Sequence, residues 1–269
     1  MLNLLPSNVV APRPGRLRGR RVLVVKTGRH DAALADAPTE AAMSRLFARE
    51  GARVAFAGPD EKAAMETVDR IHSDGGDACA IAADLAFEAD IGWMMREACQ
   101  VLGGHIDGLV LNAASGGSLE HHQFDAQQLT RVFDLNVGGL MLCCREALSN
   151  FSDSGSIVFT AAIDDAGTGW NSMGCHPVGA AIAALMRNIA DEVTSRGIRA
   201  NLVYCGPQCT PRGLGPEVSA RCDQDRMAPG RRAAAAAIGN AALFFLSDES
   251  AGITAQTLTV MHGYDRPRF

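Results

Sequence analysis

Short apolar runs alternate with longer amphipathic segments along most of this chain. The runs lie at residues 21–26, 52–57, 80–83, 105–111, 156–160 and 199–204. Continuous apolar runs with β-branched residues are typical of strands that are buried on both faces of a parallel sheet. The segments between them repeat apolar residues every three or four positions and predict helices. We therefore expect an α/β protein, built as a single Rossmann-like, doubly wound parallel sheet with helices on both faces.

The expected helices include Thr39–Glu50, Ala126–Leu148, one that begins near Pro177, and one at Gly239–Phe245 that precedes a last strand within residues 253–264. The second helix carries an apolar stripe with one polar member, Asn136. A polar side chain on a buried stripe must be hydrogen-bonded, because leaving it unpaired costs free energy. The stripe consists of Leu129, Val132, Phe133, Asn136, Leu140 and Cys143.

Composition fits one large domain, since 47% of the 269 residues are hydrophobic. We assign residues 17–269 to this domain and the Pro- and Arg-rich residues 1–16 to an extension. A net charge of −5 argues against nucleic acid or an anionic membrane as a partner. The arginines between residues 13 and 21 are interpreted as a solvated lead-in to the first strand. No apolar run is long enough for a membrane span and the start lacks signal-peptide features, so we expect a cytoplasmic protein.

The eight cysteines form no CxxC pair. Cys143 and Cys144 fall inside a predicted helix, where buried, reduced thiols are the expected state. We therefore expect no metal site and no disulfide framework.

Several short motifs occur in a fixed order along the chain. Thr27–Gly28 follow the first strand, Asp84–Leu85 the third, and Asn112–Ala113–Ala114 the fourth, while Gly206 and Thr210 follow the sixth. In this order the chain resembles the short-chain dehydrogenase/reductases over about residues 17–266. The resemblance implies that these residues bind a nicotinamide dinucleotide, and that Asn136 is the helix asparagine of the catalytic set. It also implies a mobile substrate lid at about residues 212–230.

The glycine-rich turn of that family, TGxxxGxG, is only partly present. Thr27 and Gly28 match, but the connection to the helix is about six residues longer than usual for a dinucleotide-binding turn. Pro38 and Glu40 occupy the first helical turn. A glutamate there interacts favourably with the helix dipole and competes with a phosphate for the same place.

Two features favour NADP(H) over NAD(H). The second strand ends in Ala57–Gly58–Pro59, without the acidic residue that would bind a free ribose 2′-hydroxyl. Arg29, directly after Gly28, is placed where a cation meets a 2′-phosphate. The alternative for Arg29 is an exposed loop arginine.

The catalytic serine, tyrosine and lysine of the family are missing. Their positions hold Ala162, Cys175 and Gly179. The chain has 2 tyrosines, Tyr204 and Tyr264, and neither lies on the helix that normally carries the catalytic pair. A thiol at Cys175 has no neighbouring cation to ionise it usefully. Any chemistry must therefore come from other residues.

Candidate replacements follow the fifth strand. Asp165 or its neighbour Asp164 offers a carboxylate, and Trp170 a flat apolar wall; the alternatives are a turn cap, a solvated carboxylate and lid packing. Arg131 lies on the helix that carries Asn136, either facing the substrate or on the surface. Asn136 itself has an alternative role, a structural hydrogen bond to the strand that carries Ala162.

Reduction of an iminium carbon gives a neutral amine, so it needs no proton donor, and a nearby lysine would repel the cation. The chain resembles a divergent fungal branch that reduces a cyclic iminium with NADPH and guides a [4+2] Diels–Alder closure in indole alkaloid pathways. The resemblance implies an alkaloid-like small molecule as substrate, Asp165, Arg131 and Trp170 at the pocket, and a homo-oligomer. A catalytically silent binding or oligomer partner and a cofactor-independent cyclase or isomerase stay open as alternatives.

Overall fold

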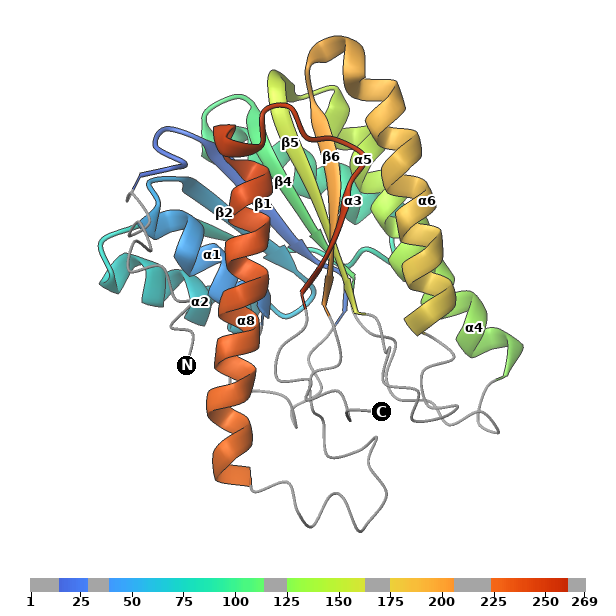
Figure 1. Ribbon diagram of the computed structural model, residues 1–269, viewed down its shortest axis with the longest axis horizontal. Helices are drawn as coiled ribbons and strands as arrows, with labels where there is room; N and C mark the ends of the chain where they lie inside the picture. Colours follow the sequence, from blue (N-terminus) through green and yellow to red (C-terminus); the bar gives the residue numbers. More distant parts are fainter. Residues whose placement is uncertain (1–14, 29–38, 114–124, 163–174, 206–223, 261–269) are drawn as a thin grey trace, which may run out of the picture.

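The computed structural model describes residues 15–28, 39–113, 125–162, 175–205 and 224–260, and its centre is a seven-stranded parallel sheet. The strands are ordered β3-β2-β1-β4-β5-β6-β7, so the order reverses between β1 and β4 (Figure 1). This confirms the predicted doubly wound sheet. The strands are β1 Arg21–Lys26, β2 Arg53–Gly58, β3 Asp77–Ala82, β4 Ile106–Asn112, β5 Phe151–Ala162, β6 Arg199–Cys205 and β7 Thr257–Val260.

Helices cover both faces of the sheet (Figure 1). On one face lie α1 (Thr39–Arg49), α2 (Glu61–Ser73) and α8 (Gln224–Leu246). On the other lie α3 (Glu88–Leu102), α4 (Ala126–Phe133), α5 (Gly139–Leu148) and α6 (Cys175–Val193). Two separate hydrophobic cores result, one on each face, because the continuous apolar strands present side chains to both. Short 3₁₀ turns at Thr194–Arg196 and Asp248–Ser250 complete the described elements.

The long helix predicted over residues 126–148 is divided in two by a π-helical turn at Asp134–Gly138. A π turn holds one residue more than an α turn, so the residues before it are rotated relative to those after it. The predicted apolar stripe is therefore not continuous. Leu129, expected to be buried, is 44% exposed, whereas Leu140 and Cys143 are buried as predicted.

The last helix differs most from its prediction. It was expected at Gly239–Phe245, but α8 begins at Gln224 and so includes residues 224–230 of the segment assigned to the lid. The alanine-rich stretch at 233–237 has strong helix propensity, which extends the helix beyond its amphipathic part. Residues 212–223 of the predicted lid lie outside the described residues.

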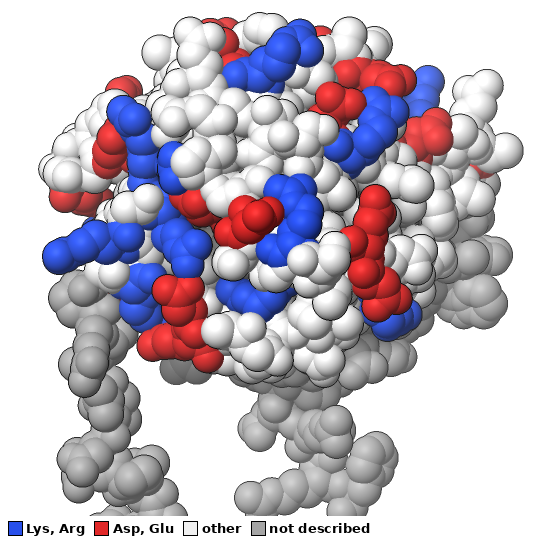
Figure 2. Space-filling view, turned by 90° about the horizontal axis from the view of Figure 1, so that it is seen from above, with Lys and Arg blue, Asp and Glu red and all other residues white. Residues whose placement is uncertain are grey.

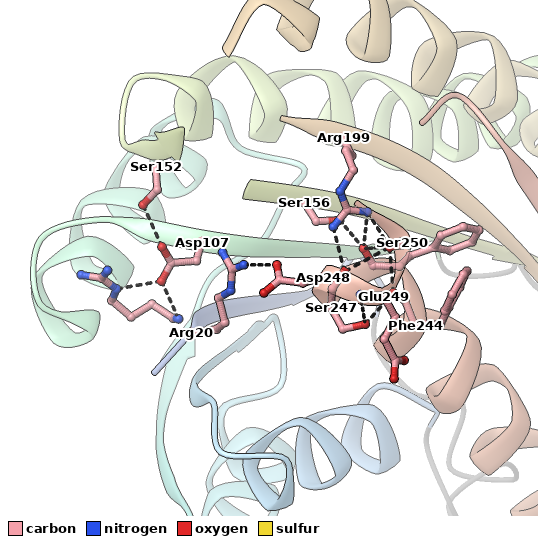
Figure 3. Close-up of polar contacts among 12 residues, drawn as sticks. Arg20, Asp107, Ser152, Ser156, Arg199, Phe244, Ser247, Asp248, Glu249 and Ser250 are labelled. Carbon is pink, nitrogen blue, oxygen red and sulfur yellow. Dashed lines mark hydrogen bonds and ion pairs between the residues drawn. The ribbon is translucent and has the colours of Figure 1, made fainter. Parts of the chain in front are cut away.

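Arg16 and Arg20, before β1, are bound to the fold rather than solvated, whereas Arg18 is exposed as predicted. Arg16 donates to Glu50 at 2.9 Å, and the backbone N–H groups of Gly15 and Arg16 donate to the same carboxylate. Arg20 forms an ion pair with Asp248 (Figure 3). The expected lead-in is therefore held by acidic partners far along the chain, which the local sequence does not reveal. The face seen in Figure 2 accordingly mixes basic and acidic side chains without a field of one sign.

Buried polar groups at the amino-terminal end of the sheet connect strands and helices (Figure 3). Arg199 on β6 donates to the carbonyl oxygen of Phe245 at 2.7 Å and to that of Ser247 at 3.1 Å. These carbonyls belong to the last turn of α8 and the residue after it, where no intrahelical donor is available. Arg199 also donates to Ser250 at 2.7 Å. One buried guanidinium thus fixes the end of α8 to the sheet.

Asp107 on β4 joins the first strand to the fifth at the same end of the sheet. It accepts from the backbone N–H of Arg21 at 2.8 Å, from the Arg21 side chain at 2.9 Å and from Ser152 at 2.8 Å. Burial by itself would raise the pKa of Asp107, but these hydrogen bonds outweigh it and hold the pKa below its usual value. The carboxylate is therefore a stabilising group at neutral pH.

We predict that Asp107→Asn lowers the free energy of unfolding at neutral pH by about 1.5–3 kcal/mol, the range for hydrogen bonds to a charged group. The folded pKa lies below the unfolded one, so the stabilisation is present above the unfolded pKa and disappears as pH falls through the folded pKa. Urea unfolding at neutral pH and near pH 3 measures both effects. Asp153→Asn, at an exposed ion pair with Arg196, is the control and should change little. An equal loss at both pH values would contradict this account.

Candidate cofactor and active site

The candidate site lies where the strand order reverses, at the carboxyl ends of β1 and β4. Ligands of open α/β sheets bind in the crevice at such a point. Lys26 ends β1 and is the register neighbour of Asn112, which ends β4. Asn112 is in turn the neighbour of Thr160 on β5. Polar side chains from three adjacent strands therefore meet at one edge of the sheet.

A buried ion pair occupies this crevice. The Nζ of Lys26 lies 3.1 Å from Oε1 of Glu40, and the two side chains are only 9% and 4% exposed. Asn112 donates from Nδ2 to Oε2 of Glu40 at 3.1 Å, and Oδ1 of Asn112 accepts from the hydroxyl of Thr160. A chain of polar contacts thus runs from β1 through α1 to β4 and β5.

Glu40 was predicted in the first turn of the helix, and the structure confirms that position. Its pairing with Lys26 was not predicted. The only local signal was an unusual lysine at the end of the apolar run RVLVVK. A charge at such a place needs an opposite charge, because burying it alone costs several kilocalories. Thr160 was likewise missed, since a threonine inside a β-branched run looks like an ordinary strand residue.

The Lys26 side chain also explains the glycine at the end of β2. A β-carbon added at Gly58 would lie 3.3 Å from the β-carbon of Lys26 and 3.6 Å from its carbonyl oxygen. Such a contact is tight enough to require a shift of the neighbour. An NAD-specific crevice is expected to carry an acidic side chain at position 58. The β-carbon of such a side chain would be in tight contact with the β-carbon of Lys26.

Asn136 is a structural anchor in this site. It is 1% exposed and lies in the π-helical turn. Its Oδ1 accepts from the hydroxyl of Thr27 at 3.1 Å, and its Nδ2 donates to the carbonyl of Val132 at 3.0 Å. The predicted structural hydrogen bond to the strand that carries Ala162 is therefore wrong, because the partner directly follows β1. Asn136 instead fixes the turn that contains Thr27 and Gly28.

The predicted adenine-side pair, Asp84 and Leu85, follows β3. Asp84 accepts from the backbone N–H of Ala86 at 3.0 Å and is partly exposed. Leu85 is 2% exposed and lies in the core beneath α5, where Gly139 approaches it closely. Ala113, after β4, is also buried and its N–H donates to the carbonyl of Thr160 at 2.9 Å. These residues line the same edge as the ion pair, and their roles toward a cofactor remain predictions.

Three positions are those at which the sequence resemblance predicts the family's catalytic groups. Ala162 is the last residue of β5, Cys175 the first of α6, and Gly179 follows one turn later. The hydroxyl of Tyr204, on β6, donates to the carbonyl oxygen of Gly179 at 2.7 Å. Burial raises the pKa of Tyr204, which makes it a weaker acid at neutral pH. Tyr204 therefore lies beside Gly179, but its raised pKa makes it a poor substitute for a proton donor.

The remaining predicted site residues divide into two groups. Arg131 is described and is exposed on α4. The others lie outside the described residues, and their roles stay predictions. They are Arg29, Ala114, Asp164, Asp165, Trp170, Gly206 and Thr210.

The described thiols are not placed for catalysis or metal binding. Burial raises the pKa of Cys143 and of Cys205 to about 12 each, so both stay protonated at neutral pH. Among the described residues, no group of three or more His, Cys, Asp or Glu side chains is arranged to hold a metal ion. Within the same ranges, every helix is too short or too polar to cross a membrane.

The sheet order and the polar edge at the β1/β4 reversal define an α/β protein of the dinucleotide-binding class. Comparison with known proteins gives the family. A family model described as enoyl-(acyl carrier protein) reductase matches residues 41–265. A hydroxysteroid dehydrogenase from Escherichia coli superimposes with a TM-score of 0.74 at 26% identity, covering 93% of this chain and 99% of that one. The chain belongs to the short-chain dehydrogenase/reductase family, a family of oxidoreductases whose fold binds NAD(H) or NADP(H).

Two curated relatives from Xanthobacter autotrophicus show how far this similarity reaches. 2-(S)-Hydroxypropyl-CoM dehydrogenase 3 is 32% identical over 237 residues, which covers 82% of this chain and 90% of that protein. A protein named inactive 2-(S)-hydroxypropyl-CoM dehydrogenase 2 is 32% identical over 231 residues, covering 82% and 98%. Equal identity to both means that overall similarity does not decide which chemistry this chain retains. That question depends on the site residues.

We predict that Asn136→Ala lowers the free energy of unfolding by about 0.5–1.5 kcal/mol, because it removes one of the buried hydrogen-bond partners of Thr27. Chemical denaturation monitored by circular dichroism measures the change. Thr130→Ala, which removes an exposed hydroxyl on α4, is the control and should change stability by no more than about 0.5 kcal/mol. Equal stability of Asn136→Ala and the unmodified chain would show that Asn136 does not anchor the Thr27 turn.

Proposed function

We propose that this protein is a cytoplasmic, NADP(H)-dependent reductase that delivers hydride to the carbon of a cyclic iminium in an alkaloid-like small molecule. The proposal rests on a contrast between the polar residues at the strand ends and the small residues at the positions expected to transfer a proton. The sheet, the strand-end polar residues and Asn136 are retained, whereas Ala162, Cys175 and Gly179 occupy the positions of the proton-transfer groups.

The chemistry of the substrate explains this contrast. Hydride addition to a carbonyl produces an alkoxide, which must be protonated by a group with a suitably lowered pKa. Hydride addition to an iminium produces a neutral amine, so no proton has to arrive. A lysine at position 179 would repel a cationic substrate, and Gly179 removes that repulsion. The one described buried lysine of the crevice, Lys26, is neutralised by Glu40 at 3.1 Å.

Asp84 and Leu85 are proposed to bracket the adenine at one end of the crevice, and Asn112 and Ala113 to allow close passage of the cofactor at the other, with Thr27 and Gly28 in the turn between these two ends. NADPH, when bound there, would supply the hydride. The buried hydrogen bond between Asn136 and Thr27 holds the turn between these two ends in place. Gly58 and Arg29 favour the cofactor with a 2′-phosphate.

Asp165 is proposed as the carboxylate that pairs with the iminium cation, with Trp170 as an apolar wall and Arg131 at the mouth of the pocket. The exposure of Arg131 on α4 agrees with a place at the edge rather than at the reacting atoms. Gly206 and Thr210 are proposed to contact the carboxamide of the nicotinamide, and Ala114 to allow its close passage. Cyclisation by a [4+2] closure would need only a shaped pocket. This second step rests on the resemblance to the fungal branch alone.

We also propose that the chain forms a homo-oligomer through α5 and α6. Ala180 and Ala184 are exposed on α6, and small residues allow another helix to approach closely. Met141 on α5 is also exposed, at 59%, and adds apolar surface to this side of the molecule. These features fit helix packing between two copies.

A second candidate function is a catalytically silent binding partner on the same fold. The observation that favours it is the buried carboxylate of Glu40 in the first turn of α1, where it opposes a phosphate. Turnover of any substrate with NADPH would exclude this alternative.

We predict that NADPH binds more tightly than NADH, because no carboxylate at position 58 selects for the free ribose hydroxyl. Titrations monitored by protein fluorescence and by calorimetry with both dinucleotides measure the two affinities. Substituting Arg29 by Gln should reduce the preference by removing one cation. Equal affinities for the two cofactors, or no binding of either at millimolar concentration, would refute the assignment.

We predict that Asp165→Asn reduces the rate of iminium reduction by about 10²–10⁴-fold, as expected for loss of a positioned charged group. Cys175→Ala should retain nearly the full rate, because no lysine activates that thiol. Steady-state assays on a cyclic iminium and on simple ketones compare these variants with the unmodified chain, and no ketone should be reduced by any of them. A dead Cys175→Ala together with an active Asp165→Asn would reverse the two roles.

A further inference from the structure

Resting on the proposed use of NADP(H), we propose that Glu40 is a built-in competitor of the cofactor's pyrophosphate, and that the Lys26–Glu40 pair sets the affinity of the crevice for dinucleotides. The pyrophosphate of a dinucleotide lies at the amino terminus of the first helix in this fold, where backbone N–H groups and the helix dipole attract negative charge. Glu40 places a carboxylate in that first turn.

The carboxylate is held by side chains from neighbouring strands. Lys26 on β1 pairs with one oxygen at 3.1 Å, and Asn112 on β4 donates to the other at 3.1 Å. Asn112 is itself oriented by the hydroxyl of Thr160 on β5. Because Glu40 is only 3% exposed as a residue, the negative charge belongs to the built crevice and not to a flexible surface side chain.

Charge explains why this arrangement opposes a phosphate. The carboxylate and an approaching pyrophosphate have the same sign, and in a buried crevice their repulsion is offset only by Lys26, which the two anions would have to share. Lys26 would attract the phosphate, but its ammonium already points at Glu40. The field of Glu40 extends across the site, since its charge adds to burial in raising the pKa of the Cys205 thiol on β6.

The pair also explains why the two unusual residues occur together. Removal of either residue would take the opposite charge away from a buried ion, which is costly even where hydrogen bonds remain. The described part of the crevice is thus satisfied before any ligand arrives. A cofactor phosphate must therefore compete with Glu40 for Lys26, because the lysine is already in an ion pair.

The test compares NADPH binding by the unmodified chain, Glu40→Gln and Glu61→Gln, using calorimetry. Glu61 is the matched control, because it is also acidic and in the first turn of a helix, but is exposed on α2. We expect Glu40→Gln to bind NADPH at least tenfold more tightly and Glu61→Gln to stay within twofold of the unmodified chain. Lys26→Met, which leaves the carboxylate without its cation, should bind more weakly.

A second readout is thermal stability with and without NADPH. Glu40→Gln should melt below the unmodified chain when free, because Lys26 loses its counter-charge, and should gain more from NADPH. If Glu40→Gln does not fold, Lys26→Met/Glu40→Ala removes both charges and opens the helix terminus. It too should bind more tightly than the unmodified chain.

The outcomes separate this inference from the proposed function. Tight NADPH binding by the unmodified chain with no gain in Glu40→Gln overturns the competitor role and leaves the reductase proposal standing. Binding only after Glu40 is replaced supports the competitor role and overturns NADP(H) use by the natural chain. No binding by any variant overturns both, because Glu40 is then not what opposes the cofactor.

Discussion

The charge of Lys26 is the constraint on which the carboxyl-terminal edge of the sheet depends. An ammonium group inside a parallel sheet requires a carboxylate nearby, and α1 supplies it from its first turn. The remaining carboxylate oxygen then requires a donor, which orients Asn112 and through it Thr160. A side chain at position 58 would begin 3.3 Å from the β-carbon of Lys26, so glycine fits there without a shift of the neighbour. One residue at a strand end thus determines the chemistry of four neighbouring elements.

The two ends of the sheet use buried polar groups for different purposes. At the amino-terminal end, Arg199 and Asp107 join strands and helices into a clamp, with hydrogen bonds that satisfy helix-end carbonyls and strand-end groups. At the carboxyl-terminal end, the polar groups line the crevice where ligands of this fold bind. The clamp therefore stabilises the fold with residues other than those that line the crevice.

Sequence patterns predicted the framework well and the site only in part. The first strand and the start of α1 at Thr39 agree with the structure, because buried β-branched runs and amphipathic periodicity are local signals. The partner of Asn136 could not be predicted, since it depends on how a helix packs against the turn after β1. The Lys26–Glu40 pair depends on the path of the chain between β1 and α1. The prediction of which side of α4 is buried was wrong for another reason. The periodicity argument assumes one regular helix, whereas the chain contains a π turn between α4 and α5.

That π turn has a consequence for the direction in which α4 presents its side chains. Each helical residue advances the side-chain direction by roughly 100°, so one extra residue at Asp134–Gly138 offsets the faces of α4 from those of α5 by about that angle. The buried face of α5 is held by the core, whereas all of α4 before the turn is partly or fully exposed. Val132 and Phe133 still pack against the core and hold α4 in place. Arg131 therefore projects from a helix whose direction is fixed by two partly buried neighbours, on a face that the regular repeat of α5 does not predict.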